Sequence, residues 1–549
     1  MSNSAWADII FFGGDIVTID HSRPLAEALA VGNGRIMEVG DRNEVFQLNG
    51  PQTRFVDLGG RTLIPGLIEP HTHILLSALV YDWIDVSGFS NASGAEVLDK
   101  LHKAAAEVKP GEWIKAFGYD PILTRDLKGL NADLLDQISI TNPVFLQIQP
   151  MHTAYVNHKA LEVVGITKDT PQPVDGQFVK DEAGNPTGVL IEQGGILPFT
   201  AAIVRNSASN ARELINNQMG RYARAGYTTI GVMGDFPFFP HAYPTLRQLA
   251  EADGSPLRMV LLDKVTDFER GLDTVGGPAT GRFKSIGVKL WYDGSPYSGN
   301  MFLDHDYLNS QLMQEGLSVP KGTRGYAMIP KETLHQLVKK YHDRGMQISI
   351  HAQGDRAIRE VIDVFEEVIR ASPRDDHRHR LEHCALFPAD QLERAARLGL
   401  TPSWHINHIY YYGEALRDEI IGADRAARMM PVADANRHGL RGSLHNDSPM
   451  YPAEPFKLMR TAVTRKTRNN QVIGADQAIS AWGALKALTI NAAWQLFLED
   501  QLGSLERGKV ADLVVLSENP LKTDPDHLDR IRVVETYSDG RRMDLDNNY

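Results

Sequence analysis

The order of β-rich and mixed segments limits the folds open to this chain. The first sixty residues suggest short strands and no helix, in the runs ADIIFFGG, DIVTID, ALAVGNGRIMEVG and RFVDL. The far end has two similar runs, KVADLVVLSENP and IRVVETYSDGRRM, and the second contains an Asp-Gly pair typical of a hairpin turn. Between these ends strands alternate with helices, which favours a parallel sheet of βα units. We therefore predict a small β unit built from both termini around an α/β middle.

Helical periodicity is clear in TLHQLVKKYHDRGM and ADQLERAARLGL, and each run ends in Gly near the next strand. The strand after the first of them, QISIHAQGD, has apolar residues on one face and Gln347, Ser349 and His351 on the other. A barrel strand whose inner face carries chemistry shows that division. An exposed edge strand shows it too.

The spacing of candidate site residues favours a barrel. A (β/α)₈ barrel uses about 31 residues for each βα unit. The interval from His351 to His383 matches one such unit, and the interval from His383 to Asp447 matches two. Lys289 precedes His351 by nearly two units, a looser fit that a long loop explains. Each of these residues ends a strand-like run, where barrel enzymes place their active sites.

Two histidines end the apolar run LIPGLIEPHTHILL. On a strand, residues i and i+2 point to the same side, so His71 and His73 converge on one point. Neutral imidazole is a common ligand of zinc and similar ions, which makes a metal site one interpretation. A chance pair among nineteen histidines is the other. The shared register of the remaining candidates favours the metal site.

Composition excludes several classes of protein. The chain has 549 residues, 42% hydrophobic and 23% charged, as in ordinary globular proteins. Its net charge of −12, without a long basic run, argues against nucleic acid as the main partner. Neither a signal peptide nor an apolar run of membrane-spanning length is evident, so we expect a soluble, cytoplasmic protein. Because Cys384 is the only cysteine, a metal would use His, Asp, Glu or a modified Lys.

Five motifs, in order, resemble the amidohydrolase superfamily and its amidohydrolase-3 branch of N-substituted formamide deformylase-like proteins: PGLIEPHTH, VKLWYDGS, SIHAQGDRAI, RLEHC and NDSP. The resemblance continues to TINAAWQLFLEDQLGSLERGKVADLVVL near the C-terminus. It implies an α/β fold, a metal-dependent TIM barrel of residues 63–499 with a β-sandwich of residues 1–62 and 500–549. The segment from about 80 to 280 is too long for strands two and three with ordinary loops, so we predict an inserted cap within it.

The resemblance also implies a set of metal ligands, position by position: His71, His73, Lys289, His351, His383 and Asp447. Lys289 matches the strand-four lysine, which in two-metal members is carboxylated by CO₂ and bridges the ions. The expected cofactor is one or two divalent ions, Zn²⁺ in particular. Glu69 stands where the family more often has Asp before the HxH pair, a departure that leaves the ligands intact.

Four further residues are predicted to bind substrate: His152, His408, Asp293 and Tyr410. His152 keeps a family histidine although Pro150 and Met151 replace the usual Asp-Gly, and it either binds the substrate carbonyl or lies in a surface loop. His408 matches the histidine of a Gln-Pro-x-His motif, and Asp293 belongs to VKLWYDGS. Tyr410 and the two tyrosines after it either line an apolar substrate pocket or pack against the barrel rim.

These residue types imply hydrolysis. A bound divalent ion lowers the pKa of its water to near 7 and polarises a carbonyl oxygen, while Asp447 takes the water proton and passes it to the leaving nitrogen. The chain shows no GxSxG elbow or phosphate-binding glycine loop. We predict cleavage of a non-peptide C–N bond in a small hydrophobic N-substituted amide, by a monomer or a homodimer. The alternatives are deamination or cyclic-amide hydrolysis, and a catalytically silent binding or regulatory protein.

Overall fold

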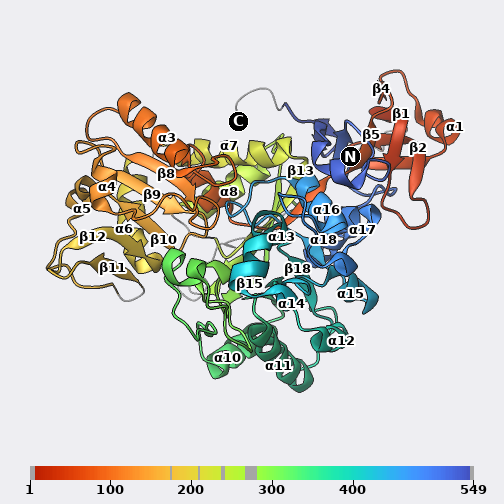
Figure 1. Cartoon of the computed structure of the whole chain (residues 1–549). Coiled ribbons are helices and arrows are strands. Elements are labelled where there is room, and N and C mark those ends of the chain that lie inside the picture. Colours follow the sequence, from red (N-terminus) through yellow and green to blue (C-terminus); the bar gives the residue numbers. More distant parts are fainter. Residues whose placement is uncertain (1–5, 174–175, 208–209, 236–240, 266–280, 545–549) are drawn as a thin grey trace.

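The computed structural model describes residues 6–173, 176–207, 210–235, 241–265 and 281–544. Its centre is a barrel of eight parallel strands whose hydrogen-bonded order follows the chain (Figure 1). The strands are β6 (Leu67–Thr72), β13 (Tyr227–Met233), β14 (Arg258–Lys264), β15 (Phe283–Trp291), β16 (Gln347–Ala352), β17 (Arg380–His383), β18 (Thr401–Trp404) and β19 (Ser443–Leu444). The predicted (β/α)₈ barrel is confirmed.

Amphipathic helices cover the barrel. The longest, α11 (Asp355–Ala371), buries one stripe of apolar residues spaced three or four apart: Ile358, Val361, Ile362, Phe365 and Val368. The two predicted helices are α10 (Lys331–His342) and α12 (Ala389–Arg397), and each is followed by a Gly with positive φ, Gly345 or Gly399. The others include α7 (Ala211–Arg224), α8 (Ala242–Glu251), α13 (Asn407–Ala415), α15 (Val432–Arg437), α16 (Pro455–Thr464), α17 (Ala481–Ala487) and α18 (Ile490–Gln495).

Strand β16 shows how the barrel turns polar side chains inward. It pairs with both β15 and β17, so it is a central strand and not an exposed edge. Gln347 donates to two buried backbone carbonyls, Ser349 donates to Glu382 at 2.8 Å, and His351 faces the cavity described below. Ile348 points to the other face and is fully buried. The inner face of the strand therefore carries the chemistry, as its sequence predicted.

A carboxylate joins the first and last strands of the barrel. In the described part of the chain no hydrogen-bonded ladder links β6 to β19. Glu69 on β6 instead accepts the backbone N–H of Asn446 at 3.1 Å and its side-chain amide at 2.7 Å, just beyond β19. Burial raises the pKa of Glu69 to about 8. Glu69 thus holds together the strand ends that carry His71 and Asp447.

Strands from both chain ends form a second sheet, at the upper right of Figure 1. It contains β1 (Ile9–Val17), β2 (Leu25–Gly32), β3 (Arg35–Gly40), β4 (Arg54–Asp57), β5 (Thr62–Pro65), β20 (Leu513–Leu516), β21 (Val533–Ser538) and β22 (Arg541–Arg542). Phe11 on β1 and Tyr537 on β21 are three strands apart, about 14 Å in a flat sheet. Their ring centroids are only 5.2 Å apart. The sheet therefore folds over itself into the two layers of the predicted β-sandwich.

Two local details of this sheet bear on the sequence predictions. Asp539 and Gly540 both have positive φ between β21 and β22, as the predicted hairpin turn requires. The expectation of no helix in the first sixty residues is wrong, because α1 (Arg42–Val45) and a 3₁₀ turn (Phe46–Leu48) follow β3. Seven residues are too few to show a helical period in the sequence.

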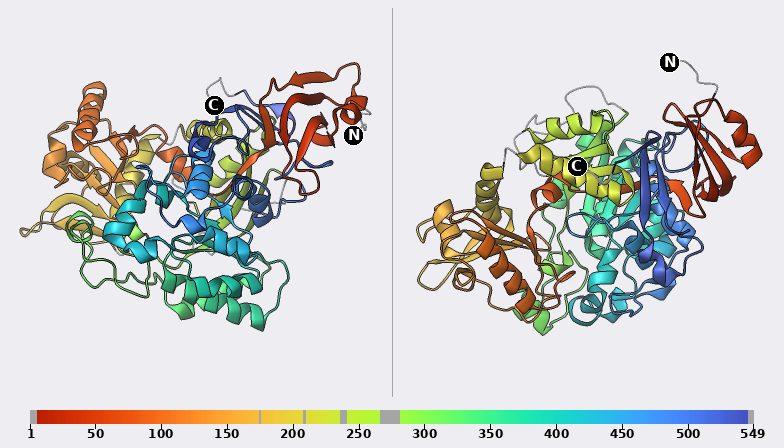
Figure 2. Two further views of the ribbon diagram at one scale, coloured as in Figure 1. Left: turned by 45° about the vertical axis from the view of Figure 1, so that its right-hand side comes forward. Right: turned by 90° about the horizontal axis from the view of Figure 1, so that it is seen from above.

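A third sheet lies on the other side of the barrel, at the left of Figure 1, and both views of Figure 2 show it apart from the β-sandwich. Its strands are β7 (Ile84–Asp85), β8 (Ile114–Tyr119), β9 (Val144–Ile148), β10 (Thr153–Val156), β11 (Gln177–Lys180) and β12 (Pro186–Ile191). The helices α3 (Gly94–Glu107), α4 (Ala132–Asp136), α5 (His158–Val164) and α6 (Glu192–Ser207) accompany them.

All of these elements lie between the first and second barrel strands, and we call residues 84–207 the cap. The cap has an apolar core of its own, which includes Val97, Leu101, Val144 and Leu146. The domain boundaries drawn from the sequence stay predictions. Among the described helices, none is long and apolar enough to cross a membrane.

Candidate active site

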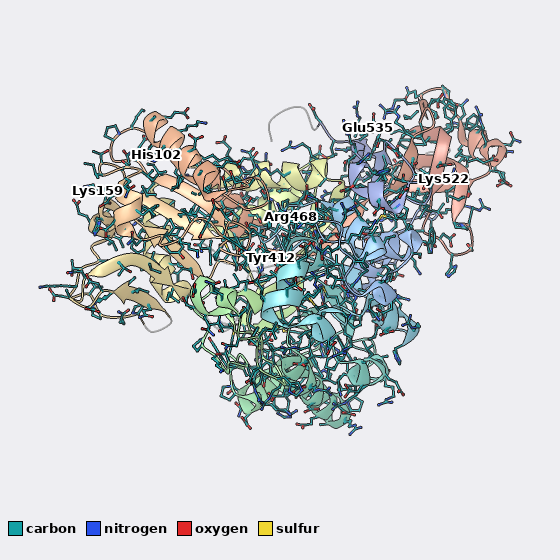
Figure 3. All side chains as sticks on the ribbon, in the orientation of Figure 1. His102, Lys159, Tyr412, Arg468, Lys522 and Glu535 are labelled. Atoms are coloured by element: carbon teal, nitrogen blue, oxygen red, sulfur yellow. The ribbon has the colours of Figure 1, made fainter. Side chains whose placement is uncertain are left out.

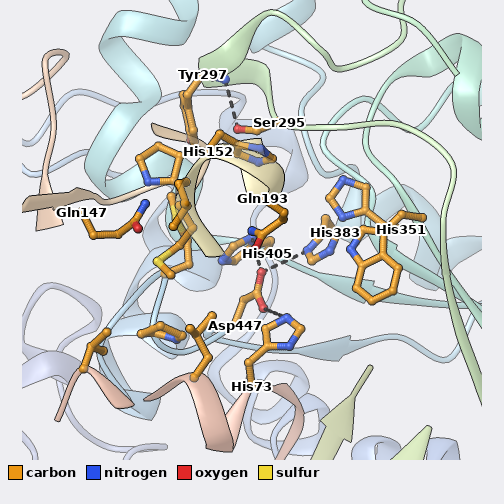
Figure 4. A pocket seen from close by; sticks show the side chains of 18 of the residues that line it. His73, Gln147, His152, Gln193, Ser295, Tyr297, His351, His383, His405 and Asp447 are labelled. Carbon is orange, nitrogen blue, oxygen red and sulfur yellow. Dashed lines mark hydrogen bonds and ion pairs between the residues drawn. The ribbon is translucent and has the colours of Figure 1, made fainter. Parts of the chain in front are cut away.

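A cavity of about 190 Å³ lies at the carboxyl ends of the barrel strands, beside the cap (Figure 4). Its polar lining includes His73, His351, His383, His405, His408 and Asp447. Its apolar lining includes Leu76, Leu79, Val80, Trp83, Met151, Ile196, Trp291 and Met450. Among the described residues that line it there is no Arg or Lys, and Asp447 is the one carboxylate.

Asp447 lies at the centre of the histidine group. Its Oδ1 is 3.4 Å from His71 Nε2 and 3.2 Å from His73 Nε2. Its Oδ2 is 3.8 Å from His383 Nδ1 and 3.9 Å from His405 Nδ1. The structure therefore brings three predicted ligands together around the carboxylate of a fourth, and adds His405 to them.

The backbone is strained where two of these side chains leave their strands. His383 has φ of 70° and Asp447 has φ of 58°, in the left-handed region that non-glycine residues rarely adopt. Strain of this kind costs about 1–3 kcal/mol per residue and clusters at active sites. Here the strained residues follow or end β17 and β19, and both side chains line the cavity.

A buried carboxylate sets the orientation of His71. Its Nδ1 donates to Glu382 Oε2 at 2.6 Å, which leaves the lone pair on Nε2 to face Asp447. Arg380 in turn holds Glu382 at 2.7 Å, and both side chains are fully buried. Burial lowers the pKa of His71 to about 4, so the ring is neutral at neutral pH. Burial alone would raise the pKa of Glu382, but Arg380 and His71 hold it well below its usual range.

Several buried atoms of this group have no hydrogen-bond partner in the part of the chain that the structure describes: His71 Nε2, His73 Nδ1, Lys289 Nζ, His405 Nδ1 and Asp447 Oδ1. Each such atom costs about 1–3 kcal/mol. In a tetrahedral site with bonds of 2.0–2.1 Å, two ligand atoms are about 3.4 Å apart. The spacings around Asp447, from 3.2 Å to 3.9 Å, are close to that value. The donor set therefore fits a divalent cation.

Lys289 and His351 lie on the neighbouring strands β15 and β16, so the interval between them is one barrel unit with a long connection. Burial lowers the pKa of Lys289 to about 8, and its Nζ is 5.4 Å from the Trp291 ring centroid. The ring centroid of His351 is 4.3 Å from that of His383. Burial, with Lys289 nearby, holds the pKa of His351 well below its usual range.

The residues predicted to bind substrate lie in different settings. His152 and His408 line the cavity, and His152 Nδ1 is 3.0 Å from Glu192 Oε2. Asp293 is outside the lining and fully buried, where it accepts the backbone N–H groups of Gln353 and Gly354 at 2.9 Å and 2.8 Å. The structure therefore places Asp293 against the loop after β16, and its predicted contact with substrate stays a prediction.

The tyrosines on α13 do not line this cavity. Tyr410 lies outside its lining, the ring of Tyr411 packs on Phe89 of the cap at 4.0 Å, and Tyr412 donates to buried Asp120 of the cap at 2.5 Å. Figure 3 labels Tyr412 where the cap and the barrel adjoin. Successive residues of a helix point about 100° apart, so a run of three tyrosines cannot face one site. Tyr410 and Tyr411 line a neighbouring pocket with Phe89, and the predicted contact of Tyr410 with substrate stays a prediction.

Glu382, His405 and His445 were missed in the sequence. His405 directly follows β18 and His445 directly follows β19, at the end of the barrel where the site lies. His445 Nε2 is 3.2 Å from His383 Nδ1, and its Nδ1 is 2.7 Å from Ser403 Oγ. The sequence signal for these two histidines is that each directly follows a strand. Strands β18 and β19 are too short to be recognised by periodicity, so the signal could not be used.

Comparisons with known proteins agree with this geometry. Residues 54–543 match the model of the amidohydrolase family. The chain is 28% identical to an N-substituted formamide deformylase of Arthrobacter pascens over 97% of both chains, and 29% identical to Protein LONG AFTER FAR-RED 3 of Arabidopsis thaliana over 93% of this chain and 88% of the relative. A solved structure of an uncharacterized metal-dependent hydrolase from Pyrococcus horikoshii has a TM-score of 0.74 at 23% identity, covering 94% of this chain and 99% of that one. The predicted resemblance is thus confirmed, and the chain belongs to the amidohydrolase family.

Proposed function

We propose that this enzyme hydrolyses the C–N bond of a small, hydrophobic N-substituted amide. The proposal rests on the lining of the cavity. Histidines and an aspartate lie at one end, and apolar side chains of the barrel and the cap form the rest of the wall. Burying an unpaired charge costs several kcal/mol by rough estimate, whereas burying an aryl or alkyl group is favourable. A substrate with an uncharged apolar group therefore suits the wall, and its amide suits the polar end.

The proposed cofactor is zinc, held by His71, His73, Lys289, His351, His383 and Asp447. Nitrogen and carboxylate donors favour zinc over magnesium or calcium, and the one thiol, Cys384, donates to a backbone carbonyl instead. When bound, the ion supplies Lewis acidity to a carbonyl oxygen and to water. Lys289 would take part as a carbamate, which forms when CO₂ adds to its neutral amine. A zinc-loaded crystal structure with a free Lys289 ammonium turned away from the ion would remove this part of the proposal.

Asp447 is the proposed proton carrier. Its carboxylate lines the cavity at the centre of the histidine group, where it can meet the attacking water. It accepts a proton from the attacking water as the water oxygen bonds to the amide carbon. It then delivers that proton to the nitrogen as the C–N bond breaks.

His152 is proposed to orient the substrate carbonyl. Its Nδ1 is 3.0 Å from Glu192 Oε2, and this contact sets the orientation of the ring in the cavity lining. The other ring nitrogen, Nε2, is the atom proposed to contact the substrate. The cap, which carries both residues, also covers the cavity and excludes water.

The test is a comparison of kcat/KM for N-benzylformamide and N-formylvaline, two formamides of similar size, of which the first carries an uncharged aryl group and the second a carboxylate. We expect at least a hundredfold preference, roughly, for the benzyl compound, because the wall offers no cation to the carboxylate. Gln193 also lines the cavity. Gln193→Lys would place an ammonium there and reduce the preference for the benzyl compound, while Gln193→Leu would keep that preference. A preference of the parent enzyme for N-formylvaline would overturn the apolar substrate class.

A further inference from the structure

The backbone fixes the tautomer of His405. The side chain is 2% exposed, and Nε2 lies 3.1 Å from the carbonyl oxygen of Asn446. A carbonyl oxygen only accepts hydrogen bonds, so Nε2 carries the ring proton. The lone pair of the neutral ring is therefore on Nδ1.

That lone pair faces a carboxylate oxygen across a buried gap. Nδ1 of His405 is 3.9 Å from Asp447 Oδ2 and has no hydrogen-bond partner within the described residues. Two buried atoms that both present lone pairs repel each other unless a proton or a cation lies between them. The nearest nitrogen of His383 borders the same gap, 3.8 Å from the same oxygen. Ligand atoms of His383, His405, His445 and Asp447 all lie within 4.8 Å of one another.

We propose that His405 is a metal ligand through Nδ1, in a divalent-cation position that it shares with Asp447 Oδ2 and His383. Oδ1 of Asp447 faces His71 and His73, whereas Oδ2 faces this position. Asp447 therefore lies between two groups of ligands. Figure 4 shows His383, His405 and Asp447 turned toward one another. The observed spacings need to contract by about 0.5 Å to reach the tetrahedral ligand separation. The inference rests on the proposed metal-dependent function and adds a ligand to it.

His408 provides a matched control on the next helical turn. It also lines the cavity, but its Nδ1 is 2.8 Å from Tyr297 Oη and 2.6 Å from Tyr451 Oη. Its Nε2 lies 3.2 Å from Gln353 Oε1. Since both nitrogens are occupied, His408 has no lone pair for a cation. Equal substitutions at the two positions therefore separate the loss of a ligand from the loss of a buried imidazole.

The experiment compares the parent with His405→Gln and His408→Gln. Glutamine at 405 can still donate to the Asn446 carbonyl but presents no lone pair at the Nδ1 position. Each protein is stripped with a chelator and titrated with Zn²⁺ against a chromophoric competitor, and the Co²⁺ forms are compared by visible absorption. We expect His405→Gln to bind Zn²⁺ at least about tenfold more weakly, with an altered Co²⁺ spectrum. His408→Gln should match the parent in both.

Three results would overturn the inference, and they can be told apart. Equal Zn²⁺ affinity and equal Co²⁺ spectra for His405→Gln and the parent would reject the ligand and leave the proposed function standing. A parent that binds neither ion would reject both. Anomalous diffraction from zinc-loaded parent crystals tests the same point without a variant, because Nδ1 of His405 should lie about 2.0–2.1 Å from an ion. A separation of more than about 3 Å from every zinc peak would also reject it.

Discussion

Two groups of buried histidines lie at opposite ends of the same barrel strands. One surrounds Asp447 at the carboxyl ends of β16 and β17. The other, at their amino ends, consists of His342, His377 and His379, and here every ring nitrogen has a partner. Nε2 of His342 donates to Ser372 O at 2.7 Å, its Nδ1 meets His379 Nε2 at 2.8 Å, and His379 Nδ1 accepts the Ile348 N–H at 3.0 Å. His377 accepts from the His379 N–H at 3.0 Å and donates to Leu398 O at 2.9 Å.

The contrast teaches that burial and clustering do not by themselves mark a metal site. Most side chains of both groups are buried. Only the carboxyl-end group leaves lone pairs unused, on His71, His73 and His405, within the described residues. The amino-end group serves stability, and the carboxyl-end group carries a structural cost that a bound cation offsets.

The largest effect expected from this contrast follows Asp447→Asn. An amide cannot take up the water proton, so turnover of metal-saturated protein should fall at least about 10²-fold. The measurement is kcat with metal analysis of the same sample. His342→Gln, at the amino-end group, is the control and should keep both values. Activity of Asp447→Asn within a factor of three of the parent would reject the assigned role.

A smaller effect is expected when one histidine is removed from each group. His351→Ala should weaken Zn²⁺ binding at least about tenfold and lower the rate with it. His379→Ala should leave Zn²⁺ affinity unchanged but lower the free energy of unfolding by about 1–3 kcal/mol, because it orphans the buried Ile348 N–H. Chelator competition and urea denaturation would measure the two quantities. The contrast between the two histidine groups would be rejected if His379→Ala weakened Zn²⁺ binding and His351→Ala lowered only the free energy of unfolding.

The smallest effect is a pH dependence of stability at the amino-end group. Burial lowers the pKa of His377 to about 4, below its ordinary value near 6.5, so the unfolded chain binds more protons between these pH values. The contribution of His377 to the free energy of unfolding is therefore fully present above pH 6.5 and is lost as the pH falls toward 4. At pH 5 the loss is about 2 kcal/mol. His377→Asn removes the titrating group but keeps an acceptor for the His379 N–H. Urea midpoints of metal-free protein should fall less steeply with acid in this variant than in the parent, and parallel profiles would contradict the assignment.

Residue spacing predicted the barrel because each βα unit has nearly constant length. The one-unit interval from His351 to His383 and the two-unit interval from His383 to Asp447 place these residues on strands five, six and eight. Residue spacing does not show which side chains on different strands contact one another. Glu382 contacts His71 across 311 positions, and no local pattern shows that contact.

The three consecutive tyrosines also show that local sequence does not reveal which side chains meet in the fold. Its composition suggests an apolar pocket, but the direction of each side chain depends on the helix phase, which three residues do not reveal. His405 shows it again, since its role depends on a tautomer set by the Asn446 carbonyl of a distant loop. The sequence thus shows which strand ends carry the chemistry, and the fold shows which nitrogen is free.

The β-sandwich has a consequence for how the protein is made. Strand β5 ends at Pro65, yet its partner β20 begins at Leu513. A ribosome adding 5–20 residues per second needs about 20–90 s to make the chain between them. For that time β5 leaves the ribosome with an unpaired edge and apolar side chains exposed. Strand β5 thus gains its last sheet partner only after residues 513–516 have been synthesised.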